Sequence, residues 1–412
     1  MINSEFHTTI KKQIKYLRMK NYPSIILKKG KEEAVKRFHP WIFSGAIQKI
    51  DKNISDGDIV NVYSAANEWL AIGHYSNSSI SIRILSTTEK FVNQDFWNYK
   101  IFNACQARIQ CGLINNISTN AYRLVFGEGD ELPGLIIDIY NKTAVIQCHT
   151  IGMHNAINEI ALAIESLPEI EIKCIYNKSS DTLNKQTGSV TFDNFIKGDN
   201  IEDIIKENNN NFKVNWVSGQ KTGFFIDQRE NRLLLSKYSK GKKILNAYCY
   251  SGGFSVYALN SGAEIVHSVD SSAKATELVK ENLILNNFDI NKHSVITEDV
   301  RAFLPKCEMY DIIILDPPAF AKHLSQKSQA IKGYKNINYN AIKKINRGGM
   351  LFTFSCSQAV DRDTFQNTVI SAAIEAGRQC RIIHFLTQPA DHPLNAFHRE
   401  GTYLKGLVLK FD

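Results

Sequence analysis

The sequence predicts an α/β protein whose second half forms a doubly wound parallel sheet, preceded by a small β-barrel and a mixed α+β region. From about Gly241 onward, short apolar strands alternate with helical stretches, which is typical of a parallel sheet covered on both faces. Between Tyr22 and Leu85, short β-type runs are separated by turn residues, which is typical of a small barrel or meander. A length of 412 residues also exceeds what one hydrophobic core usually serves, so several domains are expected.

The first 21 residues are basic and contain no apolar run long enough for a signal peptide or a membrane span. We interpret residues 1–21 as an N-terminal extension, either helical or frayed, or as a disordered tail. The expected location is therefore the cytoplasm, and no membrane partner is expected.

The predicted barrel occupies residues 22–90. Its clearest strand is 79–85, where apolar and polar residues alternate as they do in a half-buried strand. The other β-type runs are 25–27, 58–63 and 69–73. A basic segment from Lys28 to Arg37 lies at the start of this domain.

The middle α+β region is predicted to occupy residues 91–210 and to begin with a helix over 91–115. Two strands, 134–140 and 143–148, follow and are joined by a tight turn. A helix over 153–166 and a strand near 172–176 complete it. The tract Asn208–Asn211 has the composition of a turn or a boundary.

The third region, 211–412, contains the doubly wound sheet. Its clearest predicted strands are 244–249, 265–269, 312–315 and 349–354. Ligands of such sheets bind beyond the carboxyl ends of the strands. The residues that directly follow these strands are therefore the candidates for a site.

A glycine pair, Gly252-Gly253, lies where the first strand turns into its helix, within the segment 246–254. Glycines let the backbone approach a ligand and expose N–H groups at a positive helix end. The second strand ends in Asp270, which can accept hydrogen bonds from both hydroxyls of a ribose. NAD enzymes place an acid similarly, so the pattern predicts an adenosine-type ligand and leaves its identity open. For Asp270 alone, the alternative is a helix N-cap, for which Ser271 and Ser272 compete.

Two further carboxylates follow later strands. Asp299 could meet an adenine amino group, or it could cap the next helix. Asp316 begins the segment 316–320 (DPPAF), which places a carboxylate and rigid carbonyls beside a planar target and offers an aromatic ring for stacking on a flipped base. The alternative is a rigid proline loop. This segment and the lack of GxGxxG both argue against NAD.

Several segments together resemble the large-subunit ribosomal RNA cytosine-5 methyltransferases that carry an N-terminal PUA domain. The resemblance extends from about Tyr22 to Asp412, and its longest motif is 219–232 (GQKTGFFIDQRENR). The other segments are 38–43 (FHPWIF), which is similar to the start of the PUA domain, and 246–254, 316–320 and 354–357 (FSCS).

The resemblance implies a class I methyltransferase domain at 211–412 that uses S-adenosyl-L-methionine. It implies that Asp270 binds the ribose, Asp299 lies at the adenine end, and Asp316 lies between the methionine end and the target base. The residues expected at the cofactor are Phe224, Asp227, Gln228, Arg229, Asn246, Tyr250, Gly252, Gly253, Phe254, Asp270, Ser271, Asp299 and Asp316.

Methylation of cytosine carbon 5 requires a cysteine, because this carbon is a poor nucleophile until a thiolate has attacked carbon 6. Cys356 follows the strand 349–354 at the same rim as Asp316, so it is the predicted nucleophile among eight cysteines. Cys249 also lies at the rim and is expected to pack. Candidates for lowering the thiol pKa or for binding phosphate are Lys322, His323 and Lys335.

The eight cysteines form no CxxC pair and no cluster at zinc-ligand spacing, so reduced thiols and no metal are expected. The net charge of +8 is compatible with binding a polyanion. The resemblance implies that this polyanion is large-subunit ribosomal RNA, and it suggests a possible homodimer. Two alternatives stay open: methylation of a base nitrogen, which needs no cysteine, and a non-catalytic RNA-binding or ribosome-assembly factor with a relict cofactor fold.

Overall fold

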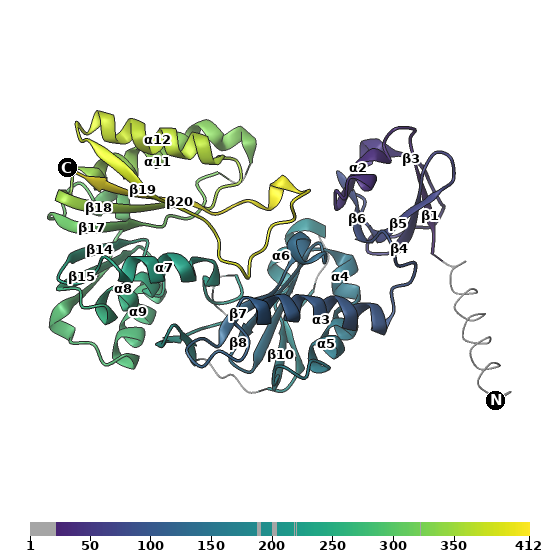
Figure 1. Ribbon diagram of the computed structural model, residues 1–412, viewed down its shortest axis with the longest axis horizontal. Coiled ribbons are helices and arrows are strands. Elements are labelled where there is room, and N and C mark those ends of the chain that lie inside the picture. The colour runs from purple at the N-terminus through teal and green to yellow at the C-terminus, as the bar shows by residue number, and fades with distance from the viewer. Residues whose placement is uncertain (1–21, 188–190, 200–203, 218, 220, 322) are drawn as a thin grey trace. The chain divides into compact units, whose positions relative to one another are not determined.

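The structure is a computed structural model that describes residues 22–187, 191–199, 204–217, 219, 221–321 and 323–412 (Figure 1). The predicted extension 1–21 and Lys322 lie outside the described residues. The described chain divides into two compact units, 22–115, 123–199 and 393–401 in the first, and 116–122, 204–392 and 402–412 in the second. The predicted domain boundaries at 22, 91 and 211 stay predictions. None of the helices in this described part is both long and apolar enough to cross a membrane.

The predicted barrel region forms a six-stranded sheet with the order β2-β6-β5-β4-β1-β3. Alternate residues of its strands point into one core, for example Val60 and Val62, and Ile82 and Ile84. The predicted strands correspond to β1, β4, β5 and β6. The sequence analysis missed β2 and β3 because they are short and mostly exposed. The elements are β1 Ser24–Leu27, α2 Glu33–Lys36, β2 Trp41–Phe43, β3 Ile47–Ile50, β4 Ile59–Tyr63, β5 Trp69–Tyr75 and β6 Ile80–Ser86.

The middle region forms a five-stranded sheet with the order β11-β10-β9-β8-β7. The predicted hairpin is present, and Asn141 adopts the left-handed backbone that its turn requires. The predicted helix over 153–166 is two helices that meet at Ala156, and the predicted helix over 91–115 ends at Gln110. The elements are α3 Gln94–Gln110, β7 Ala121–Phe126, β8 Leu135–Tyr140, β9 Thr143–Cys148, α4 Ile151–Asn155, α5 Ile157–Glu165, β10 Cys174–Asn177, α6 Ser180–Thr187 and β11 Asn194–Lys197.

The asparagine tract closes a two-stranded sheet instead of forming only a loop. Asn208 and Asn209 make the turn with left-handed backbone, while Asn210 and Asn211 belong to the second strand. Asn210 is buried because its side-chain amide donates to the carbonyl oxygens of Glu207 and Asn208. The two strands are β12 Ile204–Glu207 and β13 Asn210–Lys213.

The second unit contains the doubly wound sheet, with the order β16-β15-β14-β17-β18-β20-β19. Strands β14 to β18 are parallel, as predicted, but β20 runs antiparallel to both β18 and β19. This edge was not predicted. β20 follows β19 without a crossover helix, so it returns in the opposite direction. The strands are β14 Lys243–Ala247, β15 Ile265–Asp270, β16 His293–Thr297, β17 Tyr310–Leu315, β18 Ile345–Ser355, β19 Cys380–Leu386 and β20 Lys405–Phe411.

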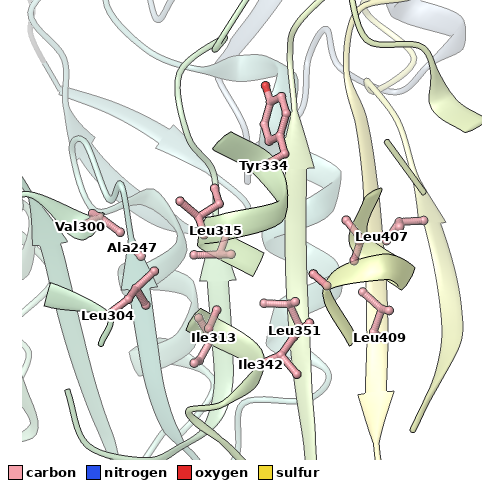
Figure 2. Close-up of a cluster of buried hydrophobic side chains, with 14 of the residues drawn as sticks. Ala247, Val300, Leu304, Ile313, Leu315, Tyr334, Ile342, Leu351, Leu407 and Leu409 are labelled. Carbon is pink, nitrogen blue, oxygen red and sulfur yellow. The ribbon is translucent and has the colours of Figure 1, made fainter. Parts of the chain in front are cut away.

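Helices cover both faces of this sheet (Figure 1). Along β17, Ile313 and Leu315 point into one core, which Figure 2 shows, and Ile312 and Ile314 point into the other. Burial of each such side chain contributes roughly 1.5–3 kcal/mol. Helices α10 Val300–Phe303, α11 Lys327–Ile342 and α12 Arg362–Glu375 pack on the first face, and α7 Arg229–Ser236, α8 Gly253–Asn260 and α9 Ala273–Leu285 on the other. The sheet therefore presents one rigid edge formed by its carboxyl ends.

Candidate active site

A cavity of about 410 Å³ lies at the carboxyl ends of the parallel strands of the second unit. Its volume is in the range of roughly 300–1,000 Å³ that is usual for small-ligand sites. Most of the predicted site residues line it, whereas Arg229, Asn246 and Gly252 do not. The predicted residues in the lining are Phe224, Asp227, Gln228, Tyr250, Gly253, Phe254, Asp270, Ser271, Asp299, Asp316 and Cys356.

The turn between β14 and α8 has an unusual backbone. Tyr248, Tyr250 and Gly252 have φ angles of 60°, 45° and 79°, which is uncommon for the two tyrosines. The Tyr250 N–H donates to Asp270 Oδ2 at 3.0 Å, and this bond helps to hold the turn. A Cβ at Gly252 would lie 3.0 Å from the Val279 side chain, so close packing against α9 requires glycine there.

Asn246, in β14, and Gly252, within this turn, lie outside the lining. The Asn246 side-chain amide donates to Ser255 Oγ at 2.9 Å within the protein interior, and Gly252 is the N-cap of α8. Both residues shape the turn that lines the cavity, and their contact with the cofactor stays a prediction.

Asp270 ends β15 with its carboxylate at the cavity. One oxygen accepts the Tyr250 N–H and the other accepts the Ser272 N–H at 2.9 Å. Ser272, not Asp270, caps α9. Each carboxylate oxygen has more than one lone pair, so the group retains acceptor capacity for ligand hydroxyls.

Asp299 lines the cavity and also caps α10. The helix cap, which was the alternative interpretation of this residue, is therefore present together with a position at the cavity. Its carboxylate accepts the Arg301 N–H at 2.7 Å and forms an ion pair with the Arg301 guanidinium at 2.9 Å. These hydrogen bonds lower the pKa of Asp299. A charged carboxylate therefore lies at this end of the cavity.

Asp316 follows β17 and is partly buried beside a second carboxylate. Burial and repulsion from Asp227 raise the pKa of Asp316 to about 7, and a hydrogen bond from Gln228 opposes this shift. Asp227 itself accepts the Tyr403 hydroxyl at 2.7 Å and lies 3.8 Å from Lys221 Nζ. Near neutral pH, a large fraction of the cofactor-free protein therefore carries a proton on Asp316.

Replacing Asp316 by asparagine is expected to stabilise the cofactor-free protein increasingly as the pH rises from about 4 to about 7. An aspartate in an unfolded chain has a pKa of about 4, so over this range the native state binds more protons than the unfolded state. The wild type therefore loses stability with rising pH, and the Asp316→Asn variant lacks this loss. Urea unfolding over a pH series measures the difference in the free energy of unfolding.

Asp311, at the start of the same strand, supplies the matched control. Burial alone would raise the pKa of Asp311, but hydrogen bonds from the Lys243 N–H and from the Asn346 side chain outweigh this effect, so its pKa lies below the usual value. The difference in the free energy of unfolding between Asp311→Asn and the wild type is therefore expected to stay constant above about pH 5. A pH-independent difference for Asp316→Asn as well would show that Asp316 is ionised throughout.

Cys356 follows β18 directly and its side chain lines the cavity. The residues on either side, Ser355 and Ser357, are fully buried, and Ser357 Oγ donates to the Ala321 carbonyl oxygen at 2.6 Å. Because neighbours in an extended segment point to opposite sides, this anchoring favours a Cys356 side chain that points into the cavity. Cys356 and Asp316 therefore lie in one site.

The charges around Cys356 act in both directions. Burial raises the pKa of its thiol, as do the carboxylates of Asp316 and Asp227, whereas Lys221 and Lys405 lower it. Cys249, the other cysteine of the lining, belongs to an apolar core, and burial raises its thiol pKa well above the ordinary value. It packs, as expected.

Of the predicted activating groups, His323 and Lys335 do not line the cavity, and Lys322 lies outside the described residues. His323 is exposed at the start of the 3-10 helix Leu324–Gln326, and Lys335 pairs with Glu375 at 2.8 Å on the outside of α11. The sequence analysis missed Lys221 and Lys405. Lys221 lies within the 219–232 motif, so that motif could have indicated it.

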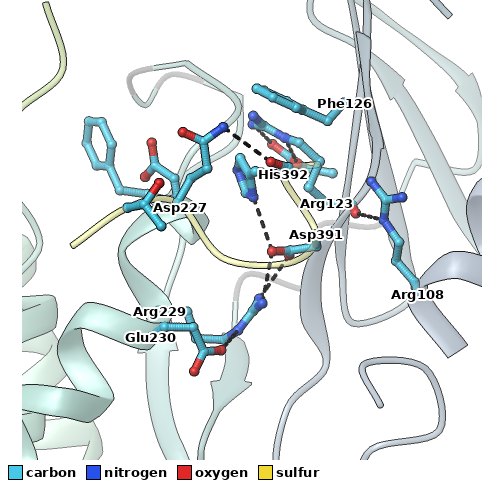
Figure 3. Close-up of polar contacts among 12 residues, drawn as sticks. Arg108, Arg123, Phe126, Asp227, Arg229, Glu230, Asp391 and His392 are labelled. Carbon is cyan, nitrogen blue, oxygen red and sulfur yellow. Dashed lines mark hydrogen bonds and ion pairs between the residues drawn. The ribbon is translucent and has the colours of Figure 1, made fainter. Parts of the chain in front are cut away.

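Arg229 does not line the cavity, and its guanidinium points to Asp391 (Figure 3). Its guanidinium donates to both carboxylate oxygens of Asp391, at 3.0 and 2.9 Å, and both side chains are buried. His392 Nδ1 contacts the same carboxylate at 3.1 Å. Arg229 therefore ties α7 to the segment that follows β19. Its approach to the cofactor stays a prediction, which this pairing does not support.

A model of PUA-like domains matches residues 25–87, and a model of S-adenosylmethionine-dependent methyltransferases matches residues 185–396. Ribosomal RNA large subunit methyltransferase I of Aeromonas hydrophila is 39% identical over 94% of this chain and 99% of the relative. The protein of the same name from Tolumonas auensis is 38% identical over 94% of this chain and 99% of the relative. The chain belongs to the ribosomal RNA large subunit methyltransferase I family.

Two solved structures share the fold of this chain. A protein described as a SAM-dependent methyltransferase from Streptococcus mutans has a TM-score of 0.80 and 22% identity, covering 94% of this chain and 99% of that chain. The methyltransferase SMU.776 in complex with SAH has a TM-score of 0.81, with the same identity and coverage. The predicted PUA-like and methyltransferase folds are thus confirmed.

As a member of this family, the protein is an S-adenosylmethionine-dependent methyltransferase. The lining of the cavity fits this cofactor. Its carboxylates complement a ligand that carries a sulfonium, an ammonium and a ribose diol, and Asp270 retains acceptor capacity there.

Proposed function

We propose that this methyltransferase forms 5-methylcytosine in large-subunit ribosomal RNA, with Cys356 as the nucleophile. The observation that supports this most strongly is the presence of Cys356 and Asp316 in the lining of one cavity. Methylation of a base nitrogen needs no thiol beside the cofactor. The names of the relatives support ribosomal RNA of the large subunit as the substrate.

Bound S-adenosylmethionine supplies an electrophilic methyl group on its sulfonium. We assign the ribose hydroxyls to Asp270, with Tyr250 and Ser271 beside them, and the adenine end to Asp299. The remaining carboxylates, Asp227 and Asp316, lie on the side of the cavity that contains Cys356. This assignment places the methionine end of the cofactor beside the thiol.

The Cys356 thiolate attacks carbon 6 of the cytosine and forms a carbon–sulfur bond, which moves an electron pair to carbon 5. Carbon 5 takes the methyl group, and S-adenosylhomocysteine leaves. The carbon 5 proton then passes to a base, for which Asp227 and Asp316 lie closest at hand, and its bonding electrons restore the double bond and expel the thiolate. Before attack, protonated Asp316 can donate a hydrogen bond to ring nitrogen 3 and draw electron density from carbon 6.

The first unit supplies an RNA-binding surface in this proposal. The basic side chains of the segment from Lys28 to Arg37 are exposed in the turn after β1 and around α2, where they can neutralise phosphates. Phe38 is 59% exposed next to them and offers a ring to an unpaired base. The predicted cytoplasmic location and homodimer stay predictions.

The test is to incubate the protein with large-subunit ribosomal RNA and a labelled methyl donor, and then to identify the labelled nucleoside by mass spectrometry. We expect 5-methylcytidine. RNA containing 5-fluorocytosine should trap an adduct on the Cys356 peptide, because fluorine replaces the carbon 5 proton and a base cannot remove it, so the thiolate is not expelled. A label on a base nitrogen would establish the first alternative, and no label at all would favour the RNA-binding factor.

Replacing Asp270 by asparagine is expected to weaken S-adenosylmethionine binding by roughly 10- to 100-fold, because hydrogen bonds to a charged acceptor contribute about 1.5–3 kcal/mol. Calorimetric titration measures the change. Asp289→Asn is the matched control: its carboxylate also accepts the N–H two residues on, from Asn291, but Asp289 does not line the cavity. If Asp270→Asn and the wild type bind S-adenosylmethionine with equal affinity, the ribose does not bind to Asp270.

A further inference from the structure

Lys405 is the first residue of β20, and the antiparallel pairing of β18 and β20 sets it opposite Ser355, the residue before Cys356. Only 3% of Lys405 is exposed. Lysine is rarely buried unless its charge is paired, because removing an ammonium group from water is costly. The position of this lysine beside the cysteine therefore requires a physical explanation.

The Lys405 ammonium group holds the backbone on one side of the cysteine. Nζ donates to the Ser357 carbonyl oxygen at 2.7 Å and to the Tyr403 carbonyl oxygen at 3.0 Å. The Ser357 hydroxyl bond to Ala321 fixes the same residue from another side. An ammonium has three donors, so two carbonyl contacts leave one N–H direction for a further acceptor.

The charges that face this pair favour a thiolate as the partner of Lys405. Burial lowers the pKa of Lys405 to about 8, and Cys356 contributes most among the groups that favour its charged form, followed by Asp361, while Arg362 opposes them. Asp361 is largely exposed and already pairs with Lys327 at 2.9 Å. Among the described groups that act on Lys405, Asp361 is thus the only carboxylate, and it is far less buried than the lysine.

Cys356 in turn faces the carboxylates of Asp316 and Asp227, which disfavour a thiolate, and the cations Lys221 and Lys405, which favour it. The Tyr334 phenol also faces this thiol, but burial raises its pKa to about 12, so it is uncharged near neutral pH. The Lys221 side chain is half exposed, so water and salt screen its charge. Lys405 is buried, so its field at the sulfur is screened much less. Lys221 has the larger effect on the pKa of the thiol, but Lys405 is the buried one of these two cations, so its contribution depends least on the surrounding salt.

We infer that Lys405 is a positioning residue of the methyl-transfer site: it anchors the segment that carries Cys356 and supplies the buried positive charge that stabilises the Cys356 thiolate. Only the role of Lys405 in methyl transfer rests on the proposed function. Its effect on the reactivity of the Cys356 thiol can be measured without RNA.

The experiment follows alkylation of Cys356 by iodoacetamide across a pH series, read from the Cys356 peptide by mass spectrometry. Exposed Cys111 in the same digest is the internal reference. Lys405→Gln keeps an amide donor but removes the charge, and is expected to slow Cys356 alkylation near pH 8 by about tenfold, since a neighbouring charge shifts a pKa by about one unit or more. Lys405→Arg should restore the rate to within about threefold.

Lys410→Gln is the matched control, since Lys410 lies on the same strand and its Nζ also donates to a carbonyl oxygen of β18, that of Gly348. Its Cys356 profile should overlay that of the wild type. Lys405→Met, which keeps the aliphatic chain, replaces Lys405→Gln if the latter does not fold. A neutral variant whose Cys356 profile is unchanged overturns the inference. If the thiol depends on Lys405 while Cys356→Ala still methylates, the proposed function fails and the inference stands.

Discussion

Replacing Cys356 by alanine is expected to reduce methyl transfer by at least about 10⁴-fold, because the carbon nucleophile forms only after the thiolate has attacked carbon 6. Binding of S-adenosylmethionine should change little, since the carboxylates around the cavity remain. The measurement is single-turnover transfer of a labelled methyl group to ribosomal RNA, with the affinity for the cofactor determined in parallel.

Cys380→Ala is the control, because Cys380 is also partly exposed but lies on β19, outside the cavity lining. It should retain wild-type transfer. Full methyl transfer by Cys356→Ala would contradict carbon methylation and favour a base nitrogen as the acceptor. Loss of cofactor binding in that variant would show that the cysteine acts through the shape of the site.

Replacing Asp391 by asparagine is expected to lower the free energy of unfolding by about 3–5 kcal/mol, because the variant removes the buried counter-charge of the Arg229 guanidinium and leaves it with the largely exposed Glu230. Burial alone would raise the pKa of Asp391, but the hydrogen bond from His392 and the charges of His392 and Arg229 hold it well below the usual range. The ion pair is therefore intact across the pH range in which the protein would be studied.

Asp412→Asn is the matched control, because Asp412 also pairs with an arginine, Arg381, but on the surface. That change should cost no more than about 1 kcal/mol. Urea unfolding gives both values. Below its melting temperature, Asp391→Asn should still bind S-adenosylmethionine, since Arg229 does not line the cavity. A large loss of affinity for S-adenosylmethionine would instead indicate that Arg229 helps to bind the cofactor.

The parts of the site that could be predicted are those in which one strand end determines the position. Asp270, Asp316 and Cys356 each follow an apolar strand directly, and parallel strands bring their carboxyl ends to one edge. The same rule led to the turn at Gly253. Local sequence was sufficient because the position of each residue depends on its own strand.

Within the motif 219–232, the local sequence does not predict which side chains face the cavity. It resembles a family motif as a whole, yet Asp227 and Gln228 face the cavity while Arg229, the next residue, points to Asp391. The direction of each side chain there depends on a segment more than 150 residues later in the chain. No pattern within the motif distinguishes these neighbours.

The sequence by itself determined the alternation of parallel strands and helices between β14 and β18, the edge of that sheet at which a site was expected, and the cysteine and carboxylates to expect there. Only the tertiary structure decided the antiparallel return of β20, the pairing of Arg229 with Asp391 and the position of Lys405 beside Cys356. The reason is physical. A strand's apolar pattern reports its own burial, whereas the partner of a buried charge is chosen by whichever distant segment packs against it.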